Sequence, residues 1–350
     1  MDSPGFVSKR LFFFLIGNAI ILNYISGQNG SSNWALLSTQ NLPIPRHECA
    51  AVGIGNSLFL LGGRRLNPVE SLDLKTATWT SLAAPPFELH HFQAITWKKE
   101  IWVIGAFTGP YPHEKPAPDI WIFNPKTNKW RQGPIIPEGR RRGSAGAFVY
   151  KKKIYLVSGI IDGHWDGHVP WFDVYNPKTA HWEALPDAPR ARDHFHAARV
   201  GTKLYLIGGR RSSGKMGQVF QQTVPEVDVF DFKTRKWSVL PPKANLPVPT
   251  AGCSSVAIGK HIWVIGGEST TQGLAHAECQ VFSTKTLQWQ QLPKLHTGRH
   301  GTQAVFFRNR LLVPAGSAKR GGGPEQTSVE FFIPPSQGIK RNQRKAKAQT

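Results

Sequence analysis

Residues 58–63 read LFLLGG, and Trp79 follows sixteen residues after this pair of glycines. The same unit recurs about every fifty residues: an apolar run ends in two small residues, and a further strand and a Trp follow. The small pairs are Gly62-Gly63, Gly105-Ala106, Ser158-Gly159, Gly208-Gly209, Gly266-Gly267 and Ala315-Gly316. The closing tryptophans are Trp79, Trp130, Trp182, Trp237 and Trp289, separated by 51, 52, 55 and 52 residues. The chain is therefore an array of similar units.

A period near fifty residues with one four-stranded unit per repeat predicts an all-β, six-bladed β-propeller. The 34 Gly and 27 Pro suit short strands and tight turns. The sixth unit ends with a strand at 328–333 and has no closing Trp, whereas residues 33–38, NWALLS, resemble an outer strand. We predict that this N-terminal strand completes the sixth blade and so removes the open edges of the array.

The repeats and their flanks predict three parts of the chain. Residues 1–27 read as a signal peptide, because Lys9-Arg10 precede an apolar run that ends at Ser26-Gly27. Residues 334–350 form a basic tail that we expect to be disordered. The propeller occupies residues 33–333, with blades near 46–82, 89–133, 142–185, 192–240, 250–292 and 299–333 plus 33–38.

The N-terminal segment predicts export to a secreted, periplasmic or extracellular location. An uncleaved anchor is the alternative, but the apolar run is short for a membrane span. The three cysteines, Cys49, Cys253 and Cys279, fall at positions that do not predict a disulfide framework, so we expect small buried side chains.

The net charge of +21 comes from 43 basic and 22 acidic residues, and its placement follows the repeat. Arg stands sixteen residues before the small pair in four of six repeats, where the other two have Leu89 and Thr250. Because the loops before the inner strand and after the second strand open on one face, we predict an Arg- and His-bearing face there and a Lys-bearing face opposite. Arg suits carboxylate, sulfate or phosphate, although it can also brace loops through backbone carbonyls. The predicted ligand-binding residues are Arg46, Arg64, Arg65, His91, Arg142, Arg192, His194, Arg210, Arg211 and Arg299.

One repeat position, fourteen residues before each small pair, is predicted to line the mouth of the central channel. The residues at this position are Glu48, His91, Ser144, His194, Gly252 and Gly301. If the mouth were catalytic, Glu48, Asp193 and Glu268 would be the candidate acid–base groups.

The loop at 162–168, DGHWDGH, carries alternating acidic and imidazole groups. Asp162, His164, Asp166 and His168 could ligate a metal, but a polar loop is the favoured interpretation, so we predict no metal and no cofactor. Trp165 in the same loop could stack on a sugar ring or pack on a neighbour.

The chain resembles the kelch-repeat propellers over about residues 33–333, although three small pairs depart from the usual Gly-Gly. Galactose oxidase has similar blades, but its copper site needs tyrosines that this chain, with six Tyr mostly in strands, does not offer. The exported sialic acid epimerases are similar in size and fold, and the similarity stops at that level. The resemblance and the charge together imply a binding module for an acidic glycan or an acidic protein segment, which we expect to be a monomer. The charge alone would also allow nucleic acid, but the export signal and the lack of a recognised nucleic-acid module argue against it. A sugar epimerase and an intracellular protein-interaction scaffold are the alternatives.

Overall fold

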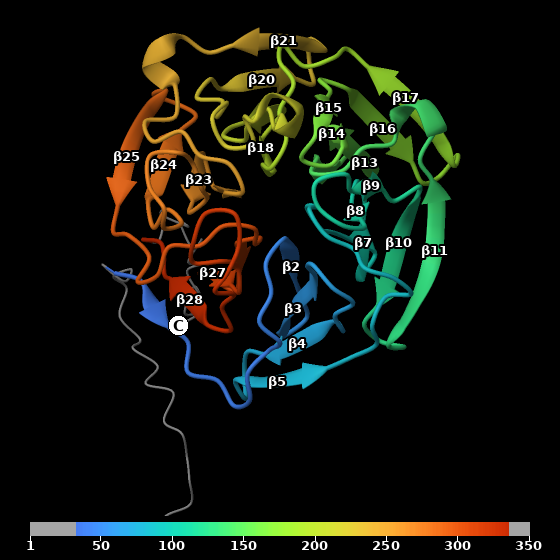
Figure 1. Ribbon diagram of the computed structural model, residues 1–350, viewed down its shortest axis with the longest axis vertical. Coiled ribbons are helices and arrows are strands. Elements are labelled where there is room, and N and C mark those ends of the chain that lie inside the picture. The colour runs from blue at the N-terminus through green and yellow to red at the C-terminus, as the bar shows by residue number, and fades with distance from the viewer. Residues whose placement is uncertain (1–32, 336–350) are drawn as a thin grey trace, which may run out of the picture.

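The computed structural model describes residues 33–335, which form a ring of six four-stranded antiparallel sheets around a central channel (Figure 1). The all-β, six-bladed prediction is confirmed. The predicted signal peptide and all but two residues of the predicted basic tail lie outside the described residues. In the described part of the chain, no helix has the length and apolar character needed to cross a membrane.

Blades 1 to 5 run from an inner to an outer strand in chain order, whereas blade 6 takes its outer strand from the N-terminal end. Blade 1 consists of β2 (Cys49–Ile54), β3 (Ser57–Gly62), β4 (Glu70–Asp73) and β5 (Thr78–Ser81), and blade 2 of β6 (Ile95–Trp97), β7 (Glu100–Val103), β10 (Asp119–Asn124) and β11 (Lys129–Ile135). Blade 3 consists of β12 (Gly146–Tyr150), β13 (Lys153–Val157), β16 (Phe172–Asn176) and β17 (His181–Leu185), and blade 4 of β18 (Ala197–Val200), β19 (Lys203–Leu206), β20 (Asp228–Asp231) and β21 (Lys236–Val239). Blade 5 consists of β22 (Ser254–Ile258), β23 (His261–Ile265), β24 (Cys279–Ser283) and β25 (Gln288–Leu292), and blade 6 of β26 (Val305–Phe307), β27 (Arg310–Pro314), β28 (Val329–Phe332) and β1 (Ala35–Leu36).

Short elements decorate the loops between these strands. They are the hairpins β8 (Phe107–Thr108) with β9 (Lys115–Pro116) and β14 (Ile160–Asp162) with β15 (Asp166–His168), and the 3-10 turns η1 (Glu138–Arg140), η2 (Gly214–Met216) and η3 (Pro242–Ala244).

The N-terminal strand closes the ring as predicted. Ala35 in β1 lies opposite Phe331 in β28, and the buried Trp34 donates its indole N–H to the carbonyl of Pro293 in the preceding blade at 2.8 Å. Four closing tryptophans make the same bond to the blade before them: Trp130 to Ala83, Trp182 to Ile135, Trp237 to Pro186 and Trp289 to Ala244. Trp34 is therefore the closing Trp of blade 6.

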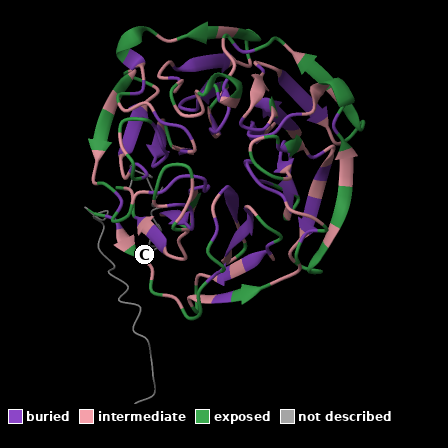
Figure 2. Cartoon of the chain, viewed as in Figure 1, coloured by how far each residue is buried: buried purple, intermediate pink, exposed green. Residues whose placement is uncertain are grey.

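Apolar side chains fill the spaces between neighbouring blades, and apart from Trp79 in β5 the buried strand residues lie on the inner three strands (Figure 2). Between blades 1 and 2, for example, Ala50 and Phe59 pack with Val103 and Phe123. Because every blade buries one face against each neighbour, the ring has no free sheet face in its interior.

Four arginines brace the blades from inside. Arg46, Arg142, Arg192 and Arg299 are fully buried, and each pairs at 2.6 Å with a buried carboxylate on the third strand of its blade: Glu70, Asp173, Asp228 and Glu330 respectively. The two remaining blades lack both partners. Blade 2 has Leu89 and Trp121 in one apolar cluster, and in blade 5 Thr250 is matched by Gln280, whose amide bonds the backbone of Val248. We therefore correct the sequence prediction for these four arginines, which stabilise the blades and do not reach a surface ligand.

Candidate functional site

The loops before the inner strands and the loops after the second strands meet on one face of the ring. Backbone bridges join them in five blades: His90 with Phe107, Gly143 with Ile160, Asp193 with Arg210, Ala251 with Glu268, and His300 with Ser317. We call the surface formed by these two sets of loops the loop face; besides the bridged residues before the inner strands it includes residues 44–48, 63–69, 107–118, 160–171, 209–227, 268–278 and 316–328.

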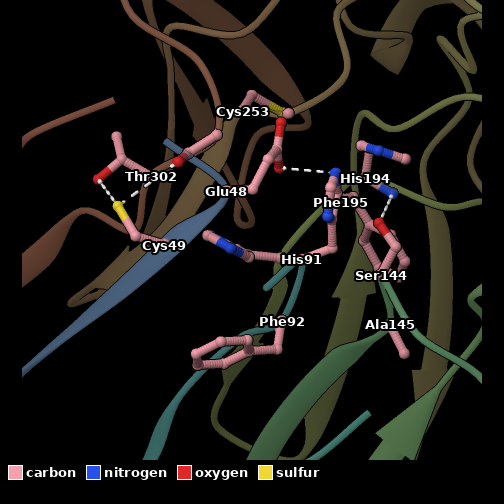
Figure 3. Close-up of a pocket in the computed structure, with 13 residues that line it drawn as sticks. Glu48, Cys49, His91, Phe92, Ser144, Ala145, His194, Phe195, Cys253 and Thr302 are labelled. Atoms are coloured by element: carbon pink, nitrogen blue, oxygen red, sulfur yellow. Dashed lines mark hydrogen bonds and ion pairs between the residues drawn. The ribbon is translucent and has the colours of Figure 1, made fainter. Parts of the chain in front are cut away.

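A closed ring of backbone hydrogen bonds surrounds the channel mouth on the loop face. Its members are the six residues fourteen positions before the small pairs, and all have left-handed backbone with φ from 52° to 63°. The N–H of each donates to the carbonyl of the preceding one: His91 to Glu48, Ser144 to His91, His194 to Ser144, Gly252 to His194 and Gly301 to Gly252. Cys49 closes the circle by donating to Gly301 at 3.1 Å. All six residues line a cavity of about 30 Å³, as the repeat predicts (Figure 3).

Two glutamine side chains cross the channel beneath this mouth. Gln93 accepts the backbone N–H groups of Ala147 and Ala197 at 2.9 and 2.8 Å, and Gln303 bonds both backbone groups of Ala94. A wider cavity of about 390 Å³ lies along the inner strands beyond them, and Arg199 is the one charged residue among its described lining residues. Along the channel, the charged groups are therefore concentrated at the mouth.

Three buried histidines converge at the mouth. The coordinating nitrogens of His91, His164 and His194 all lie within 4.8 Å of one another, and the Nε2 atoms of His164 and His194 are 3.1 Å apart. His91 and His194 come from the backbone ring, whereas His164 reaches in from the β14–β15 hairpin of blade 3.

Two of these imidazoles bond a carboxylate through the ring nitrogen that faces away from the cluster. Nδ1 of His194 bonds Asp193 at 2.5 Å, and Nδ1 of His164 bonds Glu114 at 2.8 Å. The Nε2 atom of His91 makes no hydrogen bond within residues 33–335, although it lies 3.2 Å from the carboxylate of Glu48, which points toward it across the cavity (Figure 3).

Burial and neighbouring charges set the protonation of the cluster. Burial, with the adjacent His90 and His194 rings, holds the pKa of His91 well below its ordinary value, and burial with the nearby Arg210 lowers the pKa of His194. Burial alone would raise the pKa of Glu114, but hydrogen bonds from His164 and Arg64 outweigh it and lower this pKa. The imidazoles His91 and His194 are thus neutral and the Glu114 carboxyl is ionised at pH 7.

The mouth carries more buried negative than positive charge. Glu268 accepts from Arg210 at 2.5 Å, and its pKa is lowered because the nearby His300 and Arg210 outweigh its burial. Two guanidinium groups, those of Arg64 and Arg210, face four carboxylates. The carboxylates are Glu48, Glu114, Asp193 and Glu268. This balance disfavours an anion at the centre of the mouth.

The other arginines predicted to bind ligand differ in their surroundings. Arg64 pairs with Glu114, Arg65 with Glu325 and the buried Arg210 with Glu268. Arg211 is exposed, and its side chain has no hydrogen bond or ion pair among the described residues. Free positive charge therefore lies on the rim of the loop face.

The acidic and imidazole groups of residues 162–168 do not converge. Asp162 bonds His113, and Asp166 lies 3.5 Å from Lys215. Of the four groups, only His164 lies at the mouth, where it pairs with Glu114.

An aromatic hollow of about 280 Å³ lies beside the mouth. Tyr111, Trp165 and Phe220 line it, and the Tyr111 ring centroid is 5.2 Å from that of His164. The guanidinium groups of Arg210 and Arg320 lie over the Phe220 ring at 4.9 and 5.6 Å from its centroid. The hollow thus combines flat apolar rings with cations at its edge.

The model of the KLHDC2/KLHL20/DRC7 Kelch-repeats domain matches residues 27–187 and 161–316. The chain belongs to the kelch-repeat family. It is 28% identical over 321 residues to kelch-like protein terF of Aspergillus terreus, a match that covers 85% of this chain and 67% of that protein. Kelch-like protein 40 of Xenopus tropicalis is 24% identical over 206 residues, and beta-scruin of Limulus polyphemus is 27% identical over 231 residues.

The matches to kelch-like protein 40 and beta-scruin cover 56% and 62% of this chain but only 32% and 24% of the lengths of those relatives. The solved structure of YjhT superposes with a TM-score of 0.69 at 17% identity and covers 83% of the kelch chain and 96% of its own, which shows a shared fold. Kelch propellers generally serve as protein-interaction modules.

Sequence reasoning located the mouth through the repeat but missed Glu114, and it grouped His164 with the other residues of 162–168 and not with the mouth. Both lie in loops of irregular length after the second strands, so no repeat register predicts where their side chains point. The only available signal was the presence of imidazole and carboxylate residues in those loops.

Proposed function

We propose that this chain is an exported, non-catalytic propeller that binds an anionic ligand, best an acidic glycan, in the aromatic hollow of the loop face. The observation that carries this proposal is the hollow lined by Tyr111, Trp165 and Phe220. Its volume of about 280 Å³ suits one or two sugar rings better than an extended protein segment. Flat aromatic rings offer such rings a large, rigid apolar contact.

The cations of the rim support an acidic ligand. Arg211 has no side-chain partner in the described part of the chain, the Lys215 side chain is 64% exposed, and Arg320 lies over Phe220. A carboxylate or sulfate on the sugar would pair with these groups, whereas the acidic mouth beside them would repel it. The ligand's charge would therefore face the rim and its ring the aromatic side chains.

A sugar isomerase is the second candidate, and one observation favours it. Glu48 lines the mouth cavity 3.2 Å from His91 and 3.7 Å from His300, so it could exchange a proton with a bound sugar. Glu48→Gln separates the two functions: it would leave ligand affinity unchanged in either case but would abolish turnover only in an enzyme.

A glycan array with sialylated, uronate-bearing, sulfated and neutral members tests the proposal. We expect salt-sensitive binding to acidic members, a loss of at least tenfold in Trp165→Ala, and a further loss in Arg211→Glu with Arg320→Glu. Lys178→Ala, in an exposed turn between β16 and β17, is the matched control and should bind as wild type. Binding that is insensitive to salt, or equal in Trp165→Ala and wild type, would contradict the proposal.

Export is tested by sequencing the N-terminus of the mature protein. A start near Gln28 supports cleavage of the leader, whereas retention of Met1 contradicts cleavage and leaves the uncleaved anchor and the intracellular scaffold as alternatives.

A further inference from the structure

We propose that His91, His164 and His194 form a binding site for one divalent first-row transition-metal ion, with Zn²⁺ the best fit. The site lies at the mouth of the channel and does not depend on the glycan-binding proposal. Three imidazoles with a further open position is the ligand set of catalytic zinc sites, and imidazole suits zinc, copper and nickel alike.

The separation of the imidazole nitrogens suits a shared ion. Nitrogens bound to one tetrahedral Zn²⁺ at about 2.0–2.1 Å lie roughly 3.4 Å apart. The Nε2 atoms of His164 and His194 are 3.1 Å apart, and the nitrogen of His91 lies within 4.8 Å of both. His91 completes the set if its nitrogen comes to about 3.4 Å from the other two.

The hydrogen bonds behind the rings leave lone pairs facing each other. An ionised carboxylate only accepts, so the bonds to Asp193 and Glu114 place the N–H of His194 and of His164 on Nδ1. With both rings neutral, each Nε2 then presents a lone pair, and two lone pairs at 3.1 Å repel unless a shared proton or a metal ion lies between them. A metal ion satisfies both nitrogens at once.

The carboxylates form the usual support of a metal–histidine site. A ligating His commonly donates its second N–H to a carboxylate, which fixes the ring orientation and makes the free nitrogen a better ligand. Here two of the three rings have that support, from two different blades.

Charge and space favour an ion at the same place. The four buried carboxylates of the mouth outnumber its two guanidinium groups, so a bound cation reduces an excess of negative charge. The adjacent cavity of about 30 Å³ can hold a water as a fourth ligand. Glu48 lines that cavity and could bond such a water or ligate the ion directly.

The test uses the full mature chain without a histidine tag, stripped with a chelator and then titrated with Zn²⁺ or Co²⁺. We expect one equivalent of metal by elemental analysis and visible d–d absorption with Co²⁺. His164→Asn should lower Zn²⁺ affinity at least 100-fold, and Glu114→Gln should lower it 10- to 100-fold. His113→Ala is the matched control, because His113 also bonds a carboxylate on the loop face but is exposed, and its affinity should stay within twofold.

His164 lies in the hairpin turn between β14 and β15 and outside the four-stranded blades, so the variant should still fold. Because its ring also bonds the buried Glu114, the thermal stability of the metal-free variant is measured beside its affinity. His194→Asn provides a second variant with the same expected loss of affinity. No retained metal in the wild-type chain, or equal affinity in His164→Asn and wild type, would overturn the proposal. Loss of metal in His113→Ala alone would overturn it too, because it would place the ion on the surface.

Discussion

Replacing Arg299 with Thr should destabilise the propeller without a direct effect on ligand binding. The Arg299 guanidinium is 1% exposed, pairs with Glu330 at 2.6 Å and donates to the carbonyls of Val313, Ala315 and Ser328 at 3.1–3.2 Å. Its removal leaves the fully buried Glu330 with only the N–H groups of His296 and Thr297. An uncompensated buried charge of this kind costs about 3–5 kcal/mol.

Blade 5 provides the matched rescue, since Thr250 and Gln280 occupy the equivalent positions there. Arg299→Thr with Glu330→Gln copies that pair and should recover more than about 1 kcal/mol, because the buried charge is gone. The free energy of unfolding is measured by guanidinium titration with tryptophan fluorescence. Arg131→Thr, which removes an exposed pair with Glu100, is the control and should cost less than about 1 kcal/mol. If Arg299→Thr stays within about 1 kcal/mol of wild type while ligand binding is lost, the assignment of this arginine to the framework is wrong.

Three further predictions concern ring closure, the thiols and the loop face. Trp34→Ala should cost about 3–5 kcal/mol in urea denaturation, because it empties a buried site and breaks the bond to Pro293; a cost below about 1 kcal/mol would mean that β1 does not seal the ring. Burial raises the pKa of Cys49, Cys253 and Cys279 to about 12. Ellman's reagent at pH 8 should therefore react rapidly with none of these thiols in the native protein and with all three after denaturation. A rapid reaction of the native protein would contradict their burial. Burial alone would raise the pKa of Glu325, but hydrogen bonds from His47 and Arg65 outweigh it and lower this pKa. The contribution of Glu325 to stability is therefore present above about pH 4.5 and lost as the pH falls further. The difference in Tm between wild type and Glu325→Gln should shrink below pH 4.5, and a difference that grows there would refute this coupling.

The repeat made the framework predictable because each blade has the same local requirements. The small pairs, the closing tryptophans and the use of Trp34 in blade 6 all follow from one register, and so does the ring of residues at the mouth. The same register led to a wrong prediction for arginine, which can bind a ligand or pair with a carboxylate inside the fold. Arg46 and its equivalents recur because each neutralises a carboxylate inside its own blade, and the sequence alone does not show that Glu70 lies opposite.

The site itself depends on loops that the repeat does not determine. His164 and Glu114 belong to neighbouring blades and meet because the β14–β15 hairpin contacts the segment at 112–114. That contact is set by tertiary packing between two insertions of different length. Spacing along the chain therefore identified residues 162–168 as chemically notable but grouped His164 with the wrong partners.

Hydrogen–deuterium exchange with and without an acidic glycan that binds tests most directly whether the loop face carries the function. The account predicts protection in residues 107–118, 160–168 and 209–222, around the hollow and the histidine cluster. Protection confined to residues 51–53 and 303–307, which line the wide cavity beyond the glutamines, would contradict it.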